Sequence, residues 1–294
     1  MQIIEKAFAK VNISLNLTGQ KKKNLHYIVS LVSFCDFYDT IVIEESKEFK
    51  YIINNDIKFK EPDLILKTIE TVSKEIGRNF PPFKITLNKK IPIGAGLGGG
   101  SADAAAVIRA LDKFFNLNLS YNQKVLIGKQ IGSDVPICIL SKPQIISGYG
   151  DQTRELGGLN DKNILIIFPN INVSTKEIFE SIDINLIKKK ESQEIEKNIE
   201  QNVDFYNWGK NLTKLFSNDL EEFTIKKHPS IINVRDCLNN TDSSYVSMTG
   251  SGSAFFGIFE ENSIDKVYHK ITSNYKDWKI VKCKLIGSNY GEIN

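Results

Sequence analysis

The chain has 294 residues, 41% of them hydrophobic and 25% charged, which is typical of a globular protein of about two domains and excludes fibrous and disordered classes. Basic residues exceed acidic ones by only three (38 against 35), so the overall charge does not favour nucleic-acid binding. No apolar run approaches membrane-spanning length, and the dispersed cysteines and histidines favour no zinc site. We expect a cytoplasmic protein with reduced thiols, monomeric or weakly dimeric, without nucleic-acid or membrane partners.

The first third of the chain reads as strands with one helix. Strict alternation of apolar and polar residues over 7–17 predicts a half-buried strand, with Lys10, Asn12, Ser14 and Asn16 on its polar face. Pro62 is expected to open a helix that reaches about residue 76. Further strands are expected at 28–34, 40–44, 50–53 and 83–87.

The most informative segment follows these strands. Five glycines occupy the seven positions 94–100, and an alanine-rich helix with an apolar stripe begins directly behind them. A backbone without Cβ atoms can turn its N–H groups around an anion, and a helix start adds unpaired N–H groups and the positive end of the helix dipole. The segment therefore predicts a phosphate-binding loop.

The rest of the chain mixes helices and strands. A helix is expected at 121–131, and a second domain is expected to begin near the strand at 164–168. Residues 184–202 carry few apolar side chains and read as an exposed insertion or a mobile segment. Without a steady βαβ rhythm the chain is assigned to the α+β class, with domains at 1–160 and 161–294. Further helices are expected at 176–182, 205–216, 229–238 and 264–272, and strands at 245–248, 254–259 and 279–285.

Two common phosphate motifs do not fit the glycine loop. A Walker A loop ends in Gly-Lys-Ser/Thr, whereas Gly99-Gly100-Ser101 has no lysine. The string Gly94-x-Gly96-x-x-Gly99 matches the dinucleotide fingerprint, but a second helix follows where that motif needs a strand ending in an acidic residue. A dinucleotide site is therefore disfavoured.

Three motifs in the right order resemble those of the GHMP kinase superfamily, which includes the galactokinases, homoserine kinases and mevalonate kinases. They are residues 7–13 (AFAKVNI), residues 92–102 (PIGAGLGGGSA) and residues 248–254 (MTGSGSA). Residues 9–12 and Gly132-Ser133-Asp134-Val135-Pro136 resemble the branch that acts on a cytidine diphosphate ester in isoprenoid synthesis. The resemblance implies a ribosomal protein S5 domain 2-like N-terminal domain, a ferredoxin-like C-terminal domain, and Mg²⁺-dependent phosphoryl transfer from ATP to an alcohol.

The resemblance also implies roles for individual residues. Asp134 would be the catalytic base, and Lys10 would stabilise its charge and that of the moving phosphoryl group. From the residues alone, an aspartate at position 134 is more often a turn or cap residue, and Lys10 could be an exposed strand lysine. No protein side chain is expected to bind the metal directly, with Ser101 as a possible contact. ATP would contact Pro92, Gly94, Ala95, Gly96, Leu97, Gly98, Gly99, Gly100, Ser101 and Ala102, and the other substrate Asn12, His26, Thr175, Phe179, Gly250 and Ser251.

Plainer roles stay open for several of these residues. Ser101 could simply cap the helix, Asp103 is expected to be structural, and Phe179 could pack in the core. Leu25 stands where the branch has an aromatic residue against cytosine, and Asp63 where relatives commonly have asparagine near adenine. The alternatives to the cytidine-ester kinase are a homoserine or mevalonate type kinase and a non-catalytic phospholigand-binding protein on the same fold.

Overall fold

The computed structural model describes residues 1–23, 25–54, 64–157, 161–202, 216–260 and 262–287. Asp63 and nearly all of the predicted helix at 205–216 lie outside these ranges. By its contacts the chain forms two compact units: a first unit of Met1–Lys10, Phe37–Pro92 and Gly98–Ser141, and a second unit of Val11–Asp36, Ile93–Leu97 and Lys142–Asn294. The domain boundary expected between residues 160 and 161 stays a prediction. Across the described ranges, the structure has no helix with the length and apolarity to cross a membrane.

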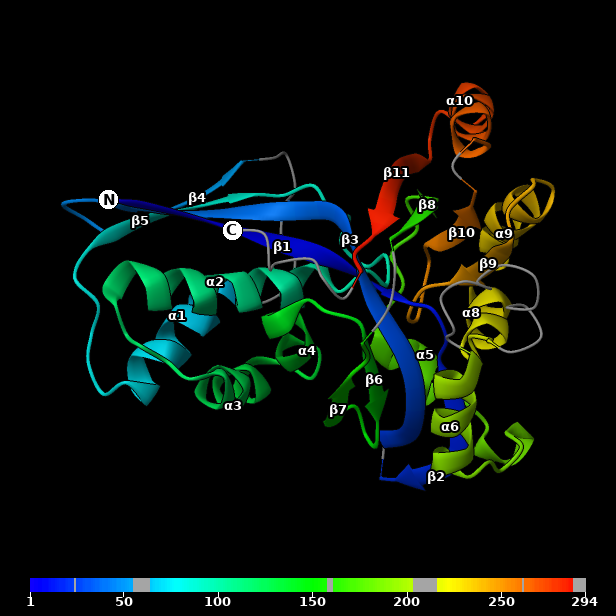
Figure 1. Ribbon diagram of the computed structural model, residues 1–294, viewed down its shortest axis with the longest axis horizontal. Coiled ribbons are helices and arrows are strands. Elements are labelled where there is room, and N and C mark those ends of the chain that lie inside the picture. Colours follow the sequence, from blue (N-terminus) through cyan, green and yellow to red (C-terminus); the bar gives the residue numbers. More distant parts are fainter. Residues whose placement is uncertain (24, 55–63, 158–160, 203–215, 261, 288–294) are drawn as a thin grey trace. The chain divides into compact units, whose positions relative to one another are not determined.

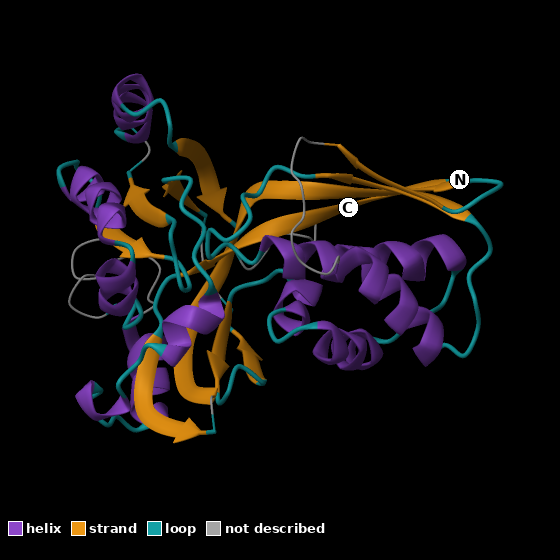
Figure 2. Cartoon of the chain, turned by 180° about the vertical axis from the view of Figure 1, so that it is seen from behind, coloured by secondary structure: helices purple, strands orange, loops and turns teal. Residues whose placement is uncertain are grey.

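The first unit packs four helices on one face of a sheet (Figures 1 and 2). Strand β5 (Phe83–Asn88) is antiparallel to the end of the long strand β3 (Leu25–Glu45) and parallel to β4 (Lys50–Asn54), and β1 (Gln2–Asn12) pairs with β3. The helices that cover this sheet are α1 (Leu64–Glu75), α2 (Gly99–Phe115), α3 (Tyr121–Ile131) and α4 (Val135–Leu140).

Local sequence explains most of these helices. In α2, small side chains allow close packing, and Ala104, Ala105 and Ala106 are fully buried. Helix α3 begins with a capping box in which Ser120 and Gln123 satisfy each other's backbone N–H groups. Both helices were predicted. Helix α4 was not, because its six residues are too few to show a helical period.

The second unit contains a four-stranded antiparallel sheet in the order β11-β8-β10-β9 (Lys279–Leu285, Lys162–Phe168, Phe255–Phe259 and Tyr245–Met248). Helix α9 (Ile232–Asn239) lies between β8 and β9 in the chain, and α10 (Ile264–Asn274) between β10 and β11. This βαββαβ order with a split crossover is the ferredoxin-like arrangement. Its core includes Leu165, Ile167, Leu220, Val234, Leu238, Met248, Phe255, Phe259, Val267 and Ile271.

The remaining elements of this unit are β2 (Asn16–Lys22), β6 (Gln144–Ser147), β7 (Gln152–Glu155), α5 (Thr175–Glu180), the 3₁₀ turn η1 (Ile184–Leu186), α6 (Ser192–Asn202), α8 (Glu221–Lys227) and the 3₁₀ turn η2 (Pro229–Ile231). Strands β6 and β7 pair as a hairpin, and β6 also pairs with β3.

One sequence-based expectation was wrong, and two were incomplete. The strand over 7–17 is broken between β1 and β2, and its polar face is buried, because other chain segments cover both faces. The strands at 28–34 and 40–44 are parts of β3, which continues through the polar residues between them. Residues 184–202 include α6, where Ile199 is only 2% exposed and Glu196 and Glu200 pair with Arg154, so the segment is not a bare insertion.

Candidate functional site

Lys10 and Asp134 meet in the first unit. The ammonium Nζ of Lys10 lies 3.3 Å from Oδ2 of Asp134, although the residues are 124 positions apart. The Lys10 side chain is 8% exposed and the Asp134 side chain 44%. Asp134 is the N-cap residue of α4, yet its carboxylate makes no capping bond. The pair therefore combines a buried cation with a carboxylate that solvent or a ligand can reach.

The start of α2 lies beside this pair. Gly98, the N-cap residue, has φ +64°, a conformation that favours glycine, and a Cβ atom there would lie 3.3 Å from the Lys10 side chain. The first N–H groups of α2 have no partner one turn earlier in the helix. Ser101 was expected as a possible cap, but the helix already begins at Gly99, which places Ser101 within the first turn. Lys10 therefore lies next to the glycine-rich start of α2.

A buried cluster of charged residues, Lys89, Asp39 and Asp103, lies next to the start of α2. Lys89 and Asp39 were not predicted from the sequence. Nζ of Lys89 lies 2.5 Å from Oδ2 of Asp39 and 2.7 Å from Oδ2 of Asp103. Asp39 also accepts hydrogen bonds from the N–H groups of Lys90 and Ile91, so it holds the chain that enters the loop. Asp39 is a fully buried charged residue of β3, and a charge between the apolar stretches 28–34 and 40–44 was the signal that could have found it. Asp103, which was expected to be structural, pairs with Lys89.

The cluster shifts the protonation of its members. Burial raises the pKa of Asp103 to about 8, although the neighbouring Lys89 ammonium opposes this rise. Burial acts to lower the pKa of Lys89, but Asp103 and Asp39 outweigh it and hold that pKa above its ordinary value. Lys89 therefore remains a cation beneath Gly99 at neutral pH.

In the second unit, the loop residues before Gly98 pack against the motif near the C-terminus. The hydroxyl of Thr249 accepts a hydrogen bond from the Asn12 N–H at 3.0 Å and donates one to the Gly96 carbonyl at 3.2 Å. The Ala254 N–H donates to the Ala95 carbonyl at 3.1 Å. Gly96 has φ +76°, and a Cβ atom there would clash with the Thr249 carbonyl oxygen. Parts of all three motifs therefore meet here, at a spacing that requires glycine.

Side chains from α5 and from the segment before α8 hold the same C-terminal loop. The Thr175 and Ser251 hydroxyls are hydrogen-bonded at 2.9 Å. Nδ2 of Asn218 donates to the carbonyls of Met248 and Gly250 at 2.7 and 2.8 Å. Asn218 was missed because one asparagine carries no motif. These bonds explain how a loop rich in glycine and serine keeps one conformation.

His26 and Phe179 form an aromatic pair in the second unit. Their ring centroids lie 5.6 Å apart, and His26 is 4% exposed. Both ring nitrogens of His26 are buried without a hydrogen-bond partner among the described residues. Burial, and then the charge of Lys21, lower the pKa of His26, so the ring is neutral at pH 7. Buried polar atoms normally have a hydrogen-bond partner, so these two nitrogens are an exception. Leu25 is 57% exposed.

The structure thus gathers the predicted residues in two sets. The first unit holds Lys10, Asp134, Pro92 and residues 98–102. The second unit holds residues 94–97 and the predicted substrate contacts Asn12, His26, Thr175, Phe179, Gly250 and Ser251.

Comparisons with known proteins agree with this arrangement. The model of the GHMP kinases N terminal domain matches residues 63–142, and that of the GHMP kinases C terminal domain matches residues 195–277. Among solved structures, a 4-(cytidine 5'-diphospho)-2C-methyl-D-erythritol kinase superposes with a TM-score of 0.78 at 23% identity, covering 97% of this chain and 100% of that one. The Methanococcus jannaschii mevalonate kinase gives 0.75 at 18% identity, covering 98% of each chain. The fold is therefore that of the GHMP kinases, which confirms the predicted class.

Sequence relatives narrow the class further. The 4-diphosphocytidyl-2-C-methyl-D-erythritol kinase of Caldicellulosiruptor saccharolyticus is 35% identical, covering 87% of this chain and 88% of that protein. The kinase of the same name from Caldanaerobacter subterraneus subsp. tengcongensis is 33% identical, covering 94% of each chain. The chain belongs to the 4-diphosphocytidyl-2-C-methyl-D-erythritol kinase family.

Proposed function

We propose that this protein transfers the γ-phosphoryl group of ATP to the 2-hydroxyl of 4-diphosphocytidyl-2-C-methyl-D-erythritol, a step of the non-mevalonate route to isoprenoid precursors. The observation that carries the proposal is the Lys10–Asp134 pair beside the glycine-rich start of α2. Relatives of about one-third identity over most of the chain carry this kinase name.

The chemistry requires a base, charge neutralisation and alignment of the phosphoryl group. Asp134 accepts the proton of the 2-hydroxyl while the hydroxyl oxygen of the substrate bonds to the γ-phosphorus. The bond between the γ-phosphorus and the β,γ-bridging oxygen breaks, which releases ADP. Lys10 lies 3.3 Å from this base and neutralises charge on the moving phosphoryl oxygens. The unpaired N–H groups at the start of α2 bind the phosphates.

Mg²⁺ fits this site as an ion carried by the nucleotide. The described residues contain no group of three or more His, Cys, Asp and Glu side chains that could hold a metal. Asp103, the acid nearest the loop in sequence, is already paired with Lys89. The phosphate oxygens would therefore supply most ligands, and the Ser101 hydroxyl in the first turn of α2 could add one. The ion would neutralise phosphate charge.

The cytidine end of the substrate is assigned to His26 and Phe179. The neutral His26 ring offers one N–H donor and one acceptor nitrogen, which suits the edge of cytosine, and neither has a hydrogen-bond partner within the described part of the chain. Phe179 provides an aromatic face next to it. Asn12, Thr175, Gly250 and Ser251 are the proposed contacts to the rest of the substrate. With Leu25 in place of an aromatic residue, stacking is expected on one face of the base only.

The test is a substrate panel with the purified protein. ADP release is measured with ATP, Mg²⁺ and either 4-diphosphocytidyl-2-C-methyl-D-erythritol, mevalonate or homoserine, and the product is identified by mass spectrometry and ³¹P NMR. Turnover with the cytidine ester alone supports the proposal. Turnover with mevalonate or homoserine instead, or ATP binding without turnover of any acceptor by folded protein, contradicts it.

A further inference from the structure

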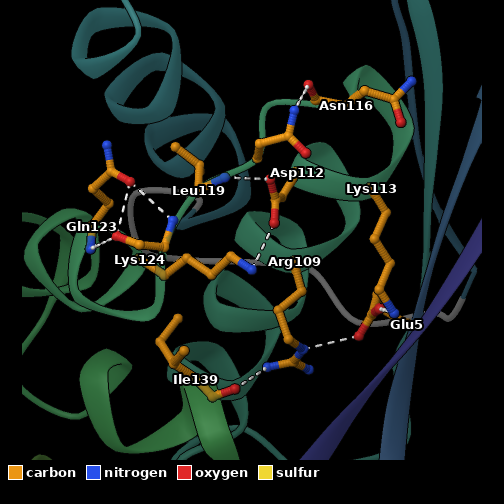
Figure 3. A network of polar contacts seen from close by, with 11 residues as sticks. Glu5, Arg109, Asp112, Lys113, Asn116, Leu119, Gln123, Lys124 and Ile139 are labelled. Carbon is orange, nitrogen blue, oxygen red and sulfur yellow. Dashed lines mark hydrogen bonds and ion pairs between the residues drawn. The ribbon is translucent and has the colours of Figure 1, made fainter.

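Arg109, in the middle of α2, forms hydrogen bonds with two elements that are far apart in the sequence, β1 and α4. Its guanidinium donates to β1 on one side, at Oε2 of Glu5 (2.9 Å) and the Lys6 carbonyl (2.7 Å). On the other side it donates to the last turn of α4, at the carbonyls of Cys138 (2.9 Å) and Ile139 (3.2 Å). Figure 3 shows the side chain between Glu5 and Ile139. All of these residues belong to the first unit.

The two joined elements carry the proposed catalytic pair. Lys10 lies on β1, four positions after Lys6, and Asp134 is the N-cap residue of α4. From Asp134 to Ile139 the helix rises only about 7.5 Å, at about 1.5 Å per residue. A clamp on the C-terminal end of so short a helix therefore also constrains its N-terminal end.

Helix α4 depends on tertiary contacts: five of its six residues are buried, and Arg109 adds polar contacts to this packing. With six residues it is too short to be stable by its own hydrogen bonds. The Arg109 side chain is 16% exposed and Glu5 9%, so the contacts to Glu5 and α4 are partly shielded from water, whereas the contact to the Lys6 carbonyl is exposed. The four bonds hold the guanidinium fork in one orientation. The positive charge also complements the carbonyl end of α4.

We propose that Arg109 is a positioning residue that sets the separation of Lys10 and Asp134 by clamping α4 to β1. The inference rests on the proposed function for the roles of these two residues. Arg109 itself touches neither reactant; it acts through the backbone of the two elements. Because phosphoryl transfer depends on alignment, a shift of about 1 Å at Asp134 would lower turnover by about 100-fold.

The same helix offers a matched control. Lys113, one turn after Arg109, pairs with the other carboxylate oxygen of Glu5 at 2.7 Å and is 62% exposed. Lys113→Met removes a cation from the same helix and the same acidic partner, but it leaves α4 clamped. Arg109→Met removes the clamp, and Arg109→Lys keeps the charge while losing the fork that reaches both elements.

The experiment compares kcat, both KM values, melting temperature and crystal structures of the full-length variants, with rates measured well below each melting temperature. We expect Arg109→Met to lower kcat by about 10- to 100-fold with the KM for ATP within about 2-fold, Arg109→Lys to recover part of the loss, and Lys113→Met to match the wild type. A kcat that falls equally in Lys113→Met, or stays unchanged in Arg109→Met, would overturn the inference.

The crystal structures of the variants test the proposal independently of activity. In Arg109→Met we expect α4 to move and the Lys10–Asp134 separation to exceed the 3.3 Å seen here. If Arg109→Met does not fold, Arg109→Lys is judged by the same distance. An unchanged distance in the folded variant overturns the positioning role. A wild-type protein without turnover of any acceptor contradicts the proposed function instead, and the distance still decides the role of Arg109.

Discussion

The Thr249 hydroxyl accepts a hydrogen bond from the Asn12 backbone N–H at 3.0 Å, across 237 positions of the chain. The same hydroxyl donates to the Gly96 carbonyl, and both partners belong to the second unit. One buried oxygen therefore joins the first, second and third sequence motifs. Four predictions concern this hydroxyl and the residues Asp134, Asp103 and His26.

Thr249→Val should destabilise the protein because valine has the same shape but leaves the Asn12 N–H buried without its acceptor. We expect a loss of about 1–3 kcal/mol in the free energy of unfolding, measured by urea denaturation. Thr249→Ser keeps the hydroxyl and serves as the control. A loss of stability in Thr249→Ser with none in Thr249→Val would show that the methyl group, and not the hydrogen bonds, matters at this position.

Asp134→Asn should lower kcat by about 100-fold or more, because the amide cannot accept the proton of the acceptor hydroxyl. ATP affinity, measured by calorimetry, should stay within about 3-fold, since the phosphate contacts are assigned to the loop and α2. Asp242→Asn, the same change at an exposed position of the second unit, is the matched control and should keep its rate. Normal turnover by Asp134→Asn would remove this residue from the mechanism.

Asp103 should make stability depend on pH. Because burial raises its pKa to about 8 from an ordinary value of 3.8, folded Asp103 holds a proton between these pH values while the unfolded chain does not. The folded state therefore loses stability as the pH rises across this window, by at most about 1.4 kcal/mol per pH unit.

Asp103→Asn should remove this dependence, because the amide is neutral throughout. Urea denaturation at several pH values between 4.5 and 8.5, roughly the window in which the two pKa values differ, measures both proteins. We expect the stability of the wild type relative to Asp103→Asn to decline with rising pH. A constant or rising difference would contradict the raised pKa.

His26→Ala should raise the KM for the cytidine substrate by about 10-fold, because the cytosine ring loses its two imidazole hydrogen-bond partners. The KM for ATP should stay unchanged. His269→Ala, at an exposed position of the same unit, is the control. Since burial lowers the pKa of His26, the wild-type KM for this substrate should be flat between pH 7 and about 8.5. An equal rise in both KM values would indicate loss of structure and not of a base contact.

Signals confined to a few neighbouring residues were readable from the sequence. The glycine run before α2, and the helices expected behind it and at 121–131, depend on residues close together in the chain. The resemblance of the three motifs and of residues 132–136 supplied the expected GHMP kinase fold and the residues Lys10 and Asp134. These features needed no knowledge of distant contacts.

Only the tertiary structure decided what depends on packing between remote segments. It buried both faces of the segment around Asn12, formed α4 from a run too short to predict, and paired Lys89 with Asp39 and Asp103. It also placed Arg109 across β1 and α4. Burial, ion pairing and helix ends of this kind arise where segments far apart in the chain exclude water together, and no local pattern records which segments those are.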